Sequence, residues 1–229
     1  MVGAPVAMTK FDIATIKLYG TPVIGVFMAT NNRVTLVPPD APEKIDEVVR
    51  STLRTEVVRV SVSKSPLLGV FITINDGGVL LSPLALDEEI RQLKSLGLSV
   101  GILRTKYTAT SNLILAGNKT ALVSPLIEPH ARSTIADVLG VEVIVGTIAG
   151  NPLVGALAVA NSRGLLVAPD ATDDDLKRLS EYFKVRVNVG TVNRGRSFLR
   201  GGIVVNDSGA LVGDETAGPE LMRIMQVLG

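Results

Sequence analysis

The stretch Asn161-Ser162-Arg163-Gly164-Leu165-Leu166-Val167-Ala168-Pro169 decides the fold, because its pattern occurs five times in the chain. Asn, Ser and Gly favour a tight turn, since they tolerate positive φ or hydrogen-bond to their own backbone. Leu165 to Val167 is a short apolar run typical of a buried strand. Pro169 ends that strand, because proline has no N–H to donate to a central ladder. The stretch therefore predicts a turn followed by a short buried strand.

The other four copies run over 31–39, 75–83, 117–125 and 206–214, and the ends of the five copies lie 42 to 45 residues apart along the chain. A near-constant period of this size over a whole chain is typical of a propeller, a solenoid or another closed array. In such arrays each unit buries its apolar faces against its neighbours, so isolated units are not stable. The 229 residues are therefore expected to form a single domain.

Each unit is predicted to follow one plan: a strand, the turn, a second strand, a helix and a third strand. In the first unit this assigns strands to 23–29, 34–37 and 57–62 and a helix to 43–53. Further helices are expected over 87–96, 131–139 and 219–228, and one that opens at Thr172, its N-cap. Gly97 and Gly140 are expected as left-handed helix caps. The units span approximately 21–62, 66–105, 111–148, 153–192 and 198–229.

The fifth unit lacks its last strand, because the chain stops at Gly229 directly after the expected helix. The strand-like segment 11–19 at the other end of the chain has no unit of its own. Pairing it with the fifth unit would remove an exposed sheet edge. We therefore expect this N-terminal strand to close the ring, and residues 1–10 to form a loose leader.

Composition narrows the class of protein. The net charge is +1, from 23 basic and 22 acidic residues, which is not typical of a free-standing nucleic-acid binder. Hydrophobic residues make up 46% of the chain but aromatic residues only 3%, so the core must consist of aliphatic side chains. The chain has no cysteine, which excludes disulfides and thiol nucleophiles and suits a reducing cytosol.

The longest uncharged run, 143–162, raises the question of a membrane span. It contains Gly146, Gly150, Pro152 and Gly155, so we interpret it as two buried strands joined by a turn. Residues 1–10 lack a basic segment leading into an apolar core, unlike a secretion signal. We expect a cytoplasmic protein that does not contact a membrane.

No residue pattern predicts catalysis, a metal site or a cofactor. His130 is the only histidine and precedes a helix, which favours a capping or surface role. The acidic runs 87–89 and 173–175 are interpreted as helix N-termini, because consecutive residues point to different sides of a helix. The glycine-bounded loops 146–150 and 190–195 match no phosphate-binding motif.

The densest basic cluster surrounds an aromatic residue: Arg194, Arg196 and Arg200 bracket Phe198. Arg and aromatic residues are enriched where proteins bind partners, although a solvated loop with an inward Phe is the alternative. Other polar residues occupy the corresponding connections between units, and a ring gathers equivalent connections at one end. The candidate binding residues are therefore Lys64, Lys106, Asn112, Asn151, Asn193, Arg194 and Phe198.

The order and spacing of the five units, together with 161–169, 189–195 and 214–221, resemble the archaeal translation initiation factor 6 family. The resemblance covers roughly 11–229 and implies an α/β pentein fold, a five-bladed propeller of strand-strand-helix-strand units around an axial cavity. Members of the family bind the large ribosomal subunit, on an L14-type ribosomal protein near the sarcin-ricin region of the large rRNA. They block joining of the small subunit sterically.

The resemblance thus implies a monomeric ribosome anti-association factor without a cofactor, and a second role in large-subunit biogenesis is left open. One alternative is a pentein enzyme that modifies guanidino groups, which the absence of cysteine disfavours, because such enzymes use a Cys nucleophile with a His partner. A second alternative is a ring that binds a protein unrelated to the ribosome. None of these functions follows from composition or periodicity.

Overall fold

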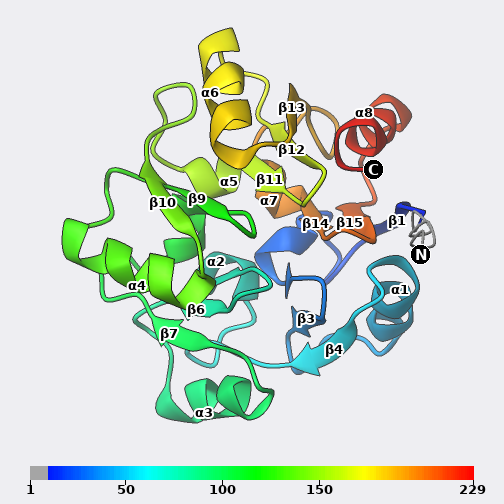
Figure 1. The fold of residues 1–229 in the computed structure, drawn as a ribbon. Helices are drawn as coiled ribbons and strands as arrows, with labels where there is room; N and C mark the ends of the chain where they lie inside the picture. Colours follow the sequence, from blue (N-terminus) through cyan, green and yellow to red (C-terminus); the bar gives the residue numbers. More distant parts are fainter. Residues whose placement is uncertain (1–9) are drawn as a thin grey trace, which may run out of the picture.

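The computed structural model describes residues 10–229, so the expected leader lies outside the described residues except for Lys10. Five three-stranded sheets surround a common axis, and five longer helices cover the outside of the ring (Figure 1). In every sheet the inner strand is antiparallel to the middle strand and the outer strand is parallel to it. This is the α/β pentein architecture that the sequence predicted.

Each of the five sheets has an inner, a middle and an outer strand, named here in that order. They are β2 (Ala29–Thr30), β3 (Val34–Val37) and β4 (Glu56–Arg59); β5 (Ile72–Ile74), β6 (Val79–Leu81) and β7 (Val100–Ile102); β8 (Ile114–Ala116), β9 (Thr120–Val123) and β10 (Glu142–Val145); β11 (Ala158–Ala160), β12 (Gly164–Val167) and β13 (Arg186–Val189); and β14 (Ile203–Val205), β15 (Gly209–Gly213) and β1 (Asp12–Ile16). The covering helices are α1 (Lys44–Thr52), α3 (Asp87–Ser95), α4 (Pro129–Leu139), α6 (Asp173–Phe183) and α8 (Gly218–Leu228).

The local signals at the helix ends are confirmed. Gly97 and Gly140 have φ values of +73° and +64°, the left-handed conformation that glycine adopts without a steric cost. The hydroxyl of Thr172 accepts a hydrogen bond from the backbone N–H of Asp175 at 3.1 Å, so Thr172 is the N-cap of α6.

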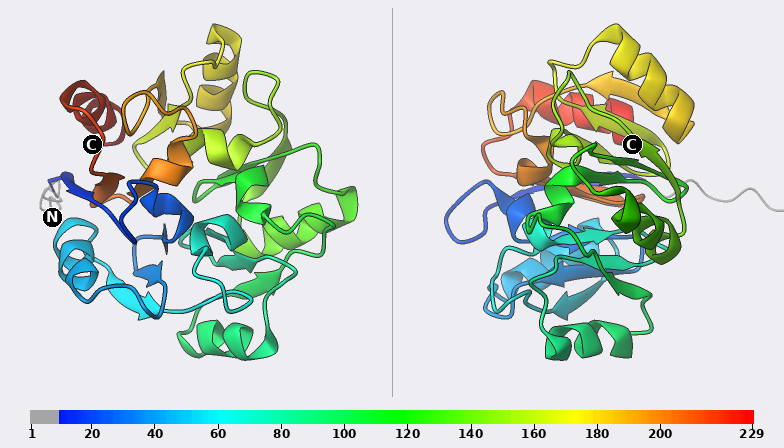
Figure 2. Two further views of the ribbon diagram at one scale, coloured as in Figure 1. Left: turned by 180° about the vertical axis from the view of Figure 1, so that it is seen from behind. Right: turned by 90° about the vertical axis from the view of Figure 1, so that its left-hand side faces the viewer.

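The expected strand over 23–29 is wrong in its first half, where Ile24–Val26 forms the 3-10 helix η1. Equivalent short helical turns precede the other inner strands: α2 (Leu68–Phe71), η2 (Thr110–Leu113), α5 (Val154–Leu157) and α7 (Leu199–Gly202). The interpretation of 143–162 as two strands joined by a turn also missed α5. The five short helices crowd around the axis (Figure 2, left). Short apolar runs do not distinguish a strand from a helical turn, which explains the error.

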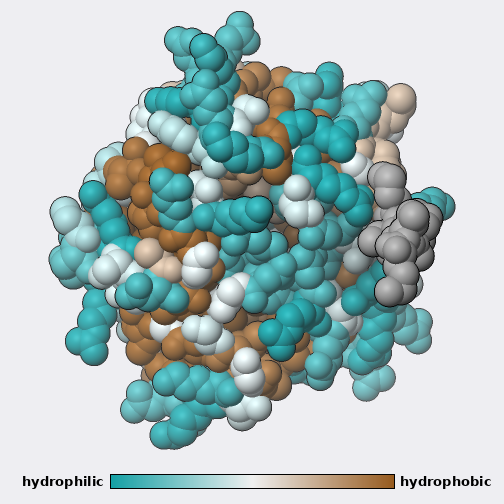
Figure 3. Space-filling view, in the orientation of Figure 1, coloured by the Kyte–Doolittle hydropathy of each residue, from teal (hydrophilic) through white to brown (hydrophobic). Residues whose placement is uncertain are grey.

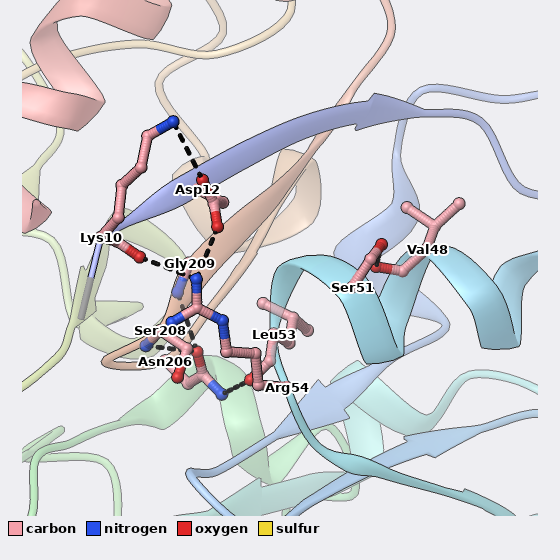
Figure 4. Close-up of polar contacts among 9 residues, drawn as sticks. All are labelled: Lys10, Asp12, Val48, Ser51, Leu53, Arg54, Asn206, Ser208 and Gly209. Atoms are coloured by element: carbon pink, nitrogen blue, oxygen red, sulfur yellow. Dashed lines mark hydrogen bonds and ion pairs between the residues drawn. The ribbon is translucent and has the colours of Figure 1, made fainter.

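The N-terminal strand closes the ring, as predicted. β1 pairs in parallel with β15, from Asp12 opposite Gly209 to Ile16 opposite Gly213. Figure 4 shows how the first unit holds this strand: the Arg54 guanidinium donates to the Asp12 carboxylate at 2.7 Å and to the Lys10 carbonyl at 3.2 Å. The first strand of the chain therefore completes the last sheet, and it continues through residues 19–20 into the first unit.

The hydrophobic core lies between neighbouring units and is aliphatic apart from Phe11. Val49 and Leu53 of α1, for example, belong to one buried cluster with Val204 and Leu211 of the fifth unit. Phe11, with 4% of its surface exposed, belongs to a cluster with Ile224 and Leu228 of α8. Because each cluster draws on two units, no unit can bury its apolar face alone.

The turns that decided the fold meet at one end of the axis; we call them the Asn turns (residues 31–33, 75–77, 117–119, 161–163 and 206–208). The side chains of Asn31, Asn75, Asn161 and Asn206 each donate to a backbone carbonyl of the next turn around the ring, at 2.9 to 3.1 Å. Their Oδ1 atoms accept from backbone N–H groups of their own turns. The centre of this face is accordingly hydrophilic (Figure 3).

Candidate binding face

The connections between units lie at the end of the ring opposite the Asn turns. Each follows an outer strand, and the outer strands all run parallel to their middle strands, so their carboxyl ends share one side. In the side view of Figure 2 the loops around residues 20 and 194 (blue and orange) project from the same side. We call these connections the inter-unit turns (residues 19–20, 63–64, 105–106, 149–150 and 193–195).

Four of the inter-unit turns are tight reversals with left-handed backbone at consecutive residues. Positive φ occurs at Tyr19 and Gly20, Ser63 and Lys64, Ala149 and Gly150, and Asn193 to Gly195. Isolated bridges such as Val62 to Ser65 flank them. Non-glycine residues in this region carry strain unless their surroundings hold them.

Four carboxylates, Glu89, Glu128, Asp175 and Glu220, bind the backbone of these turns, and we call them the clamp carboxylates. Glu89 accepts from the N–H groups of Ser63 at 2.8 Å and Lys64 at 3.0 Å. The other three bind their own turns: Glu128 accepts from Lys106 N–H at 3.4 Å, Asp175 from Ala149 N–H at 3.0 Å, and Glu220 from Arg194 and Gly195 N–H at 3.2 and 2.9 Å. Each turn is thus attached to the helical segment of the unit that it enters.

The electrostatics of the clamp carboxylates reflect these hydrogen bonds. Burial alone would raise the pKa of Glu89, Asp175 and Glu220, but hydrogen bonds from backbone and hydroxyl groups outweigh it, and each pKa is lowered. The pKa of Glu128 is lowered chiefly by the hydroxyl of Thr105, which donates at 2.6 Å. All four groups are therefore charged at neutral pH and keep the turns preorganised.

The first inter-unit turn is held differently, through a side chain. The Tyr19 hydroxyl donates to the Asp40 carboxylate at 2.5 Å, and its ring meets Phe27 edge-on at 5.0 Å between centroids. Burial, together with this hydrogen bond, raises the pKa of Tyr19 to about 12. Tyr19 therefore remains a neutral donor at physiological pH.

A cavity of about 520 Å³ opens among the short helical turns at this end; we call it the mouth cavity. It brings together three of the seven predicted binding residues, Asn112, Asn193 and Phe198. Phe198 is 51% exposed, the second most exposed of the large hydrophobic side chains in residues 10–229. An exposed aromatic beside an apolar cavity is a common feature of protein-binding sites.

The other four predicted residues do not line the mouth cavity. Lys64, Lys106 and Arg194 are exposed on the inter-unit turns, and Asn151 is half-buried directly after one. Asn193 itself is 2% exposed, and its side chain is engaged with the Pro22 carbonyl and the Thr216 hydroxyl. Its side chain supports the turn from inside, whereas Phe198 and Asn112 face the opening.

Sequence reasoning missed two features of this end. Arg200 was grouped with the exposed basic cluster, but its guanidinium turns into the ring and donates to the carbonyls of Gly69 and Ile72. Of the clamp carboxylates, Glu89 and Asp175 were recognised only as parts of helix N-termini, and Glu128 and Glu220 were not singled out. The signal available was that Glu89 and Asp175 are the third acids of their runs, the position that reaches back past the helix start.

The only hydrogen-bond contact of the His130 ring among residues 10–229 is with a backbone carbonyl. His130 is exposed and its Nε2 lies 3.3 Å from the Arg104 carbonyl. Within residues 10–229 no three His, Asp or Glu side chains lie together as a metal site would require. In the same part of the chain, none of the helices combines the length and apolarity needed to cross a membrane.

Among solved structures, the fold resembles a crystal structure of a dimethylarginine dimethylaminohydrolase variant, with a TM-score of 0.49 and 12% identity. The likeness covers 73% of this chain and 68% of that one. At this level of similarity no function can be transferred.

Curated relatives are far closer in sequence. A protein named translation initiation factor 6 from Pyrobaculum aerophilum is 76% identical over 219 residues, which cover 96% of this chain and all of the relative. Proteins of the same name from Saccharolobus islandicus and Pyrococcus abyssi are each 40% identical, over 95% of this chain and 99% and 98% of their own lengths. A sequence model of the eIF-6 family matches residues 13–227. The chain belongs to the eIF-6 family.

Proposed function

We propose that this protein binds the large ribosomal subunit in the cytoplasm and sterically prevents the small subunit from joining it. Membership of the eIF-6 family, whose curated members here are named translation initiation factor 6, carries the proposal. The partner is an L14-type ribosomal protein near the sarcin-ricin region of the large rRNA. The protein acts as a monomer, without a cofactor and without catalysis.

The binding surface we propose is the end of the ring that holds the mouth cavity and the inter-unit turns. Phe198 offers a large exposed apolar side chain at the cavity, and Asn112 offers an amide beside it. Preorganised turns bind with a smaller entropic cost than flexible ones. Lys64, Lys106 and Arg194 surround this centre as exposed cations suited to the negative rRNA.

The charge of the chain argues for a protein contact at the centre of this surface. With a net charge of +1, bulk attraction to rRNA is weak, so most of the affinity should come from a compact apolar patch. Truncation of a central interface residue typically costs about 2 kcal/mol or more. The exposed cations would mainly set the association rate and its salt dependence.

Co-sedimentation with purified large subunits, followed by a subunit-joining assay, tests the proposal. Phe198→Ala and Asn112→Ala should each weaken large-subunit binding about tenfold or more, because about 1.4 kcal/mol corresponds to a factor of ten. Lys119→Ala, in an Asn turn at the opposite end, is the matched control and should bind normally. Lys119 is exposed. Arg163, in another Asn turn, is a less suitable control, because its guanidinium lies 5.9 Å from the centre of the Phe11 ring and supports the fold.

Two outcomes would overturn the proposal. If the intact protein neither sediments with large subunits nor slows joining, the ribosomal partner is wrong, and a ring that binds another protein is favoured. If Lys119→Ala loses binding while Phe198→Ala and Asn112→Ala bind normally, the opposite face is the binding surface. Thermal melts of all variants separate binding losses from folding losses.

A further inference from the structure

A cleft of about 520 Å³ opens beside the third inter-unit turn, and we call it the cationic cleft. Residues 104–106 line it from the turn, and Glu128 and His130 line it from the start of α4. The same connection continues directly into η2, whose Asn112 lines the mouth cavity. The cationic cleft therefore belongs to the end of the ring that we propose as the binding surface.

The two permanent cations of the cleft remain available to a ligand. Arg104 and Lys106 are both exposed, and neither forms an ion pair among residues 10–229. The Lys106 ammonium lies 5.1 Å from the centre of the Tyr107 ring, a cation–π contact that helps to hold it in place. A negatively charged ligand can therefore bind both groups without first breaking an ion pair.

The single carboxylate in the cleft lining is engaged with the turn itself. Glu128 accepts from the Thr105 hydroxyl at 2.6 Å and from the Lys106 N–H at 3.4 Å. The Nε2 atom of His130 lies 3.3 Å from the Arg104 carbonyl and carries a hydrogen, because a carbonyl only accepts. The two cations outnumber Glu128, so the lining is positively charged even with a neutral His130.

The third inter-unit turn differs from the second and fourth in the charge of the helix beside it. α4 is the one covering helix without an acidic residue in its first turn, because its clamp carboxylate Glu128 is the N-cap. α3 and α6 each carry three acids there, among them the exposed Asp87 and Glu88 beside the turn of Lys64. Such acids repel an anion, so a negatively charged strand is repelled less at the third turn than at the second or fourth.

We propose that the cationic cleft binds the phosphodiester backbone of an RNA strand of the large subunit. The inference rests on the proposed function, because it takes the large subunit as the partner. A guanidinium can donate two parallel hydrogen bonds to one phosphate, and a lysine ammonium binds another as a point charge. Among the described residues, none of the exposed large hydrophobic side chains lines the cleft, whereas Phe198 lines the mouth cavity. A protein partner therefore finds its apolar anchor at the mouth cavity and not at the cleft.

The salt dependence of large-subunit binding tests the cleft. Arg104→Gln/Lys106→Gln removes both cations. Arg91→Gln/Lys94→Gln is the matched control, because it removes the same charge from exposed positions of α3. Each phosphate contact adds about 0.7–0.9 to the slope of log affinity against log salt concentration, so two contacts contribute about 1.4–1.8.

The cleft variant should lose that part of the slope, and the control should keep the slope of the intact protein. A rise in salt of about fourfold should then weaken binding of the intact protein about tenfold more than binding of the cleft variant.

A photocrosslink tests whether the partner is RNA. The chain has no cysteine, so His130→Cys introduces a single thiol at the cleft, to which azidophenacyl bromide is attached. Irradiation of this protein on large subunits should crosslink it to the large rRNA, at positions that primer extension identifies. The same reagent on Lys94→Cys, at an exposed position of α3, should give no rRNA crosslink.

Failure of the cleft can be told from failure of the proposed function. If the intact protein does not bind large subunits, both are wrong. If it binds, but the cleft variant keeps the salt slope of the intact protein or the probe at position 130 reaches only ribosomal proteins, the role of the cleft alone is refuted. Thermal melts show whether the variants fold, and the crosslink decides by itself if the double variant does not.

Discussion

Replacing Phe11 with alanine should weaken closure of the ring by several kcal/mol. Phe11 precedes β1, is 4% exposed, and packs in one cluster with Ile224 and Leu228 of α8 and Leu166 of the fourth unit. Loss of a buried Phe side chain to Ala typically costs about 3–5 kcal/mol. The cation–π contact with Arg163, at 5.9 Å, adds roughly 0.5–1 kcal/mol. Against a total stability of about 5–15 kcal/mol this is a large fraction.

Equilibrium urea unfolding measures this effect. The transition of Phe11→Ala should remain single, with an unchanged slope and a midpoint lowered by on the order of 1 M, given a slope of about 3 kcal/mol/M. Lys10→Ala is the control and should be almost silent, because its ion pair with Asp12 spans 3.9 Å and the lysine is 86% exposed. Deleting 1–8 should also do little, whereas deleting 1–19 should destabilise the whole fold. A loss below about 1 kcal/mol for Phe11→Ala, or a separate early transition for the N-terminus, would refute both the closure argument and the expectation of a single domain.

The remaining predictions concern pH, packing and chemistry. The pKa values of the clamp carboxylates in the folded state lie below 4.5 for Glu and below 3.8 for Asp, so the stability that these groups contribute is complete above about pH 5 and is lost as the pH falls through the lowered pKa values. Glu89→Gln should therefore flatten the acid side of a profile of stability against pH, and an unchanged profile would contradict the role of the clamp carboxylates. Gly155→Ala places a Cβ 2.0 Å from the Ser111 carbonyl and should cost about 1–3 kcal/mol or more in thermal or urea unfolding, whereas Gly218→Ala, with open space around it, should cost almost nothing; equal effects would contradict the packing argument. The protein should not hydrolyse arginine analogues in a citrulline assay, because it has no thiol nucleophile; turnover that disappears in His130→Ala would show the opposite.

The sequence predicted the fold because its signals repeat. Five Asn- or Gly-initiated turns at a constant period determine five equivalent units, and the missing last strand after 219–228 determines the role of segment 11–19. Thr172 and Gly140 were likewise predictable from the residue type alone, because the Thr172 hydroxyl can cap a helix and Gly140, without a Cβ, adopts the left-handed conformation freely. Features that depend on a few neighbouring residues could therefore be predicted from the sequence.

Features that depend on residues distant in the sequence could not be predicted from it. Whether Arg200 points to solvent or into the ring depends on carbonyls of Gly69 and Ile72, more than 120 positions away. The reach of Glu89 to the turn at Lys64 depends on how two units pack, which no local propensity encodes. The mouth cavity gathers Asn112, Asn193 and Phe198, as an argument from ring symmetry would expect, but the buried role of Asn193 required its contacts to Pro22 and Thr216.

The belt of Asn side chains at the other end is interrupted at one place. The third unit has Gly117 where the others have Asn, and no side chain there donates to the fourth unit's turn within the described residues. The Phe183 ring packs against this glycine, and the one side-chain hydrogen bond of the belt at this seam among the described residues comes from outside the turn, where the Thr120 hydroxyl donates to the Tyr182 carbonyl at 3.1 Å. At the seam between the fifth and first units, by contrast, Asn206 donates to the carbonyls of Asn31 and Leu53. The seam between the third and fourth units therefore has fewer hydrogen bonds from its Asn turn than the seam between the last unit and the first, and we expect transient opening of the belt to begin there.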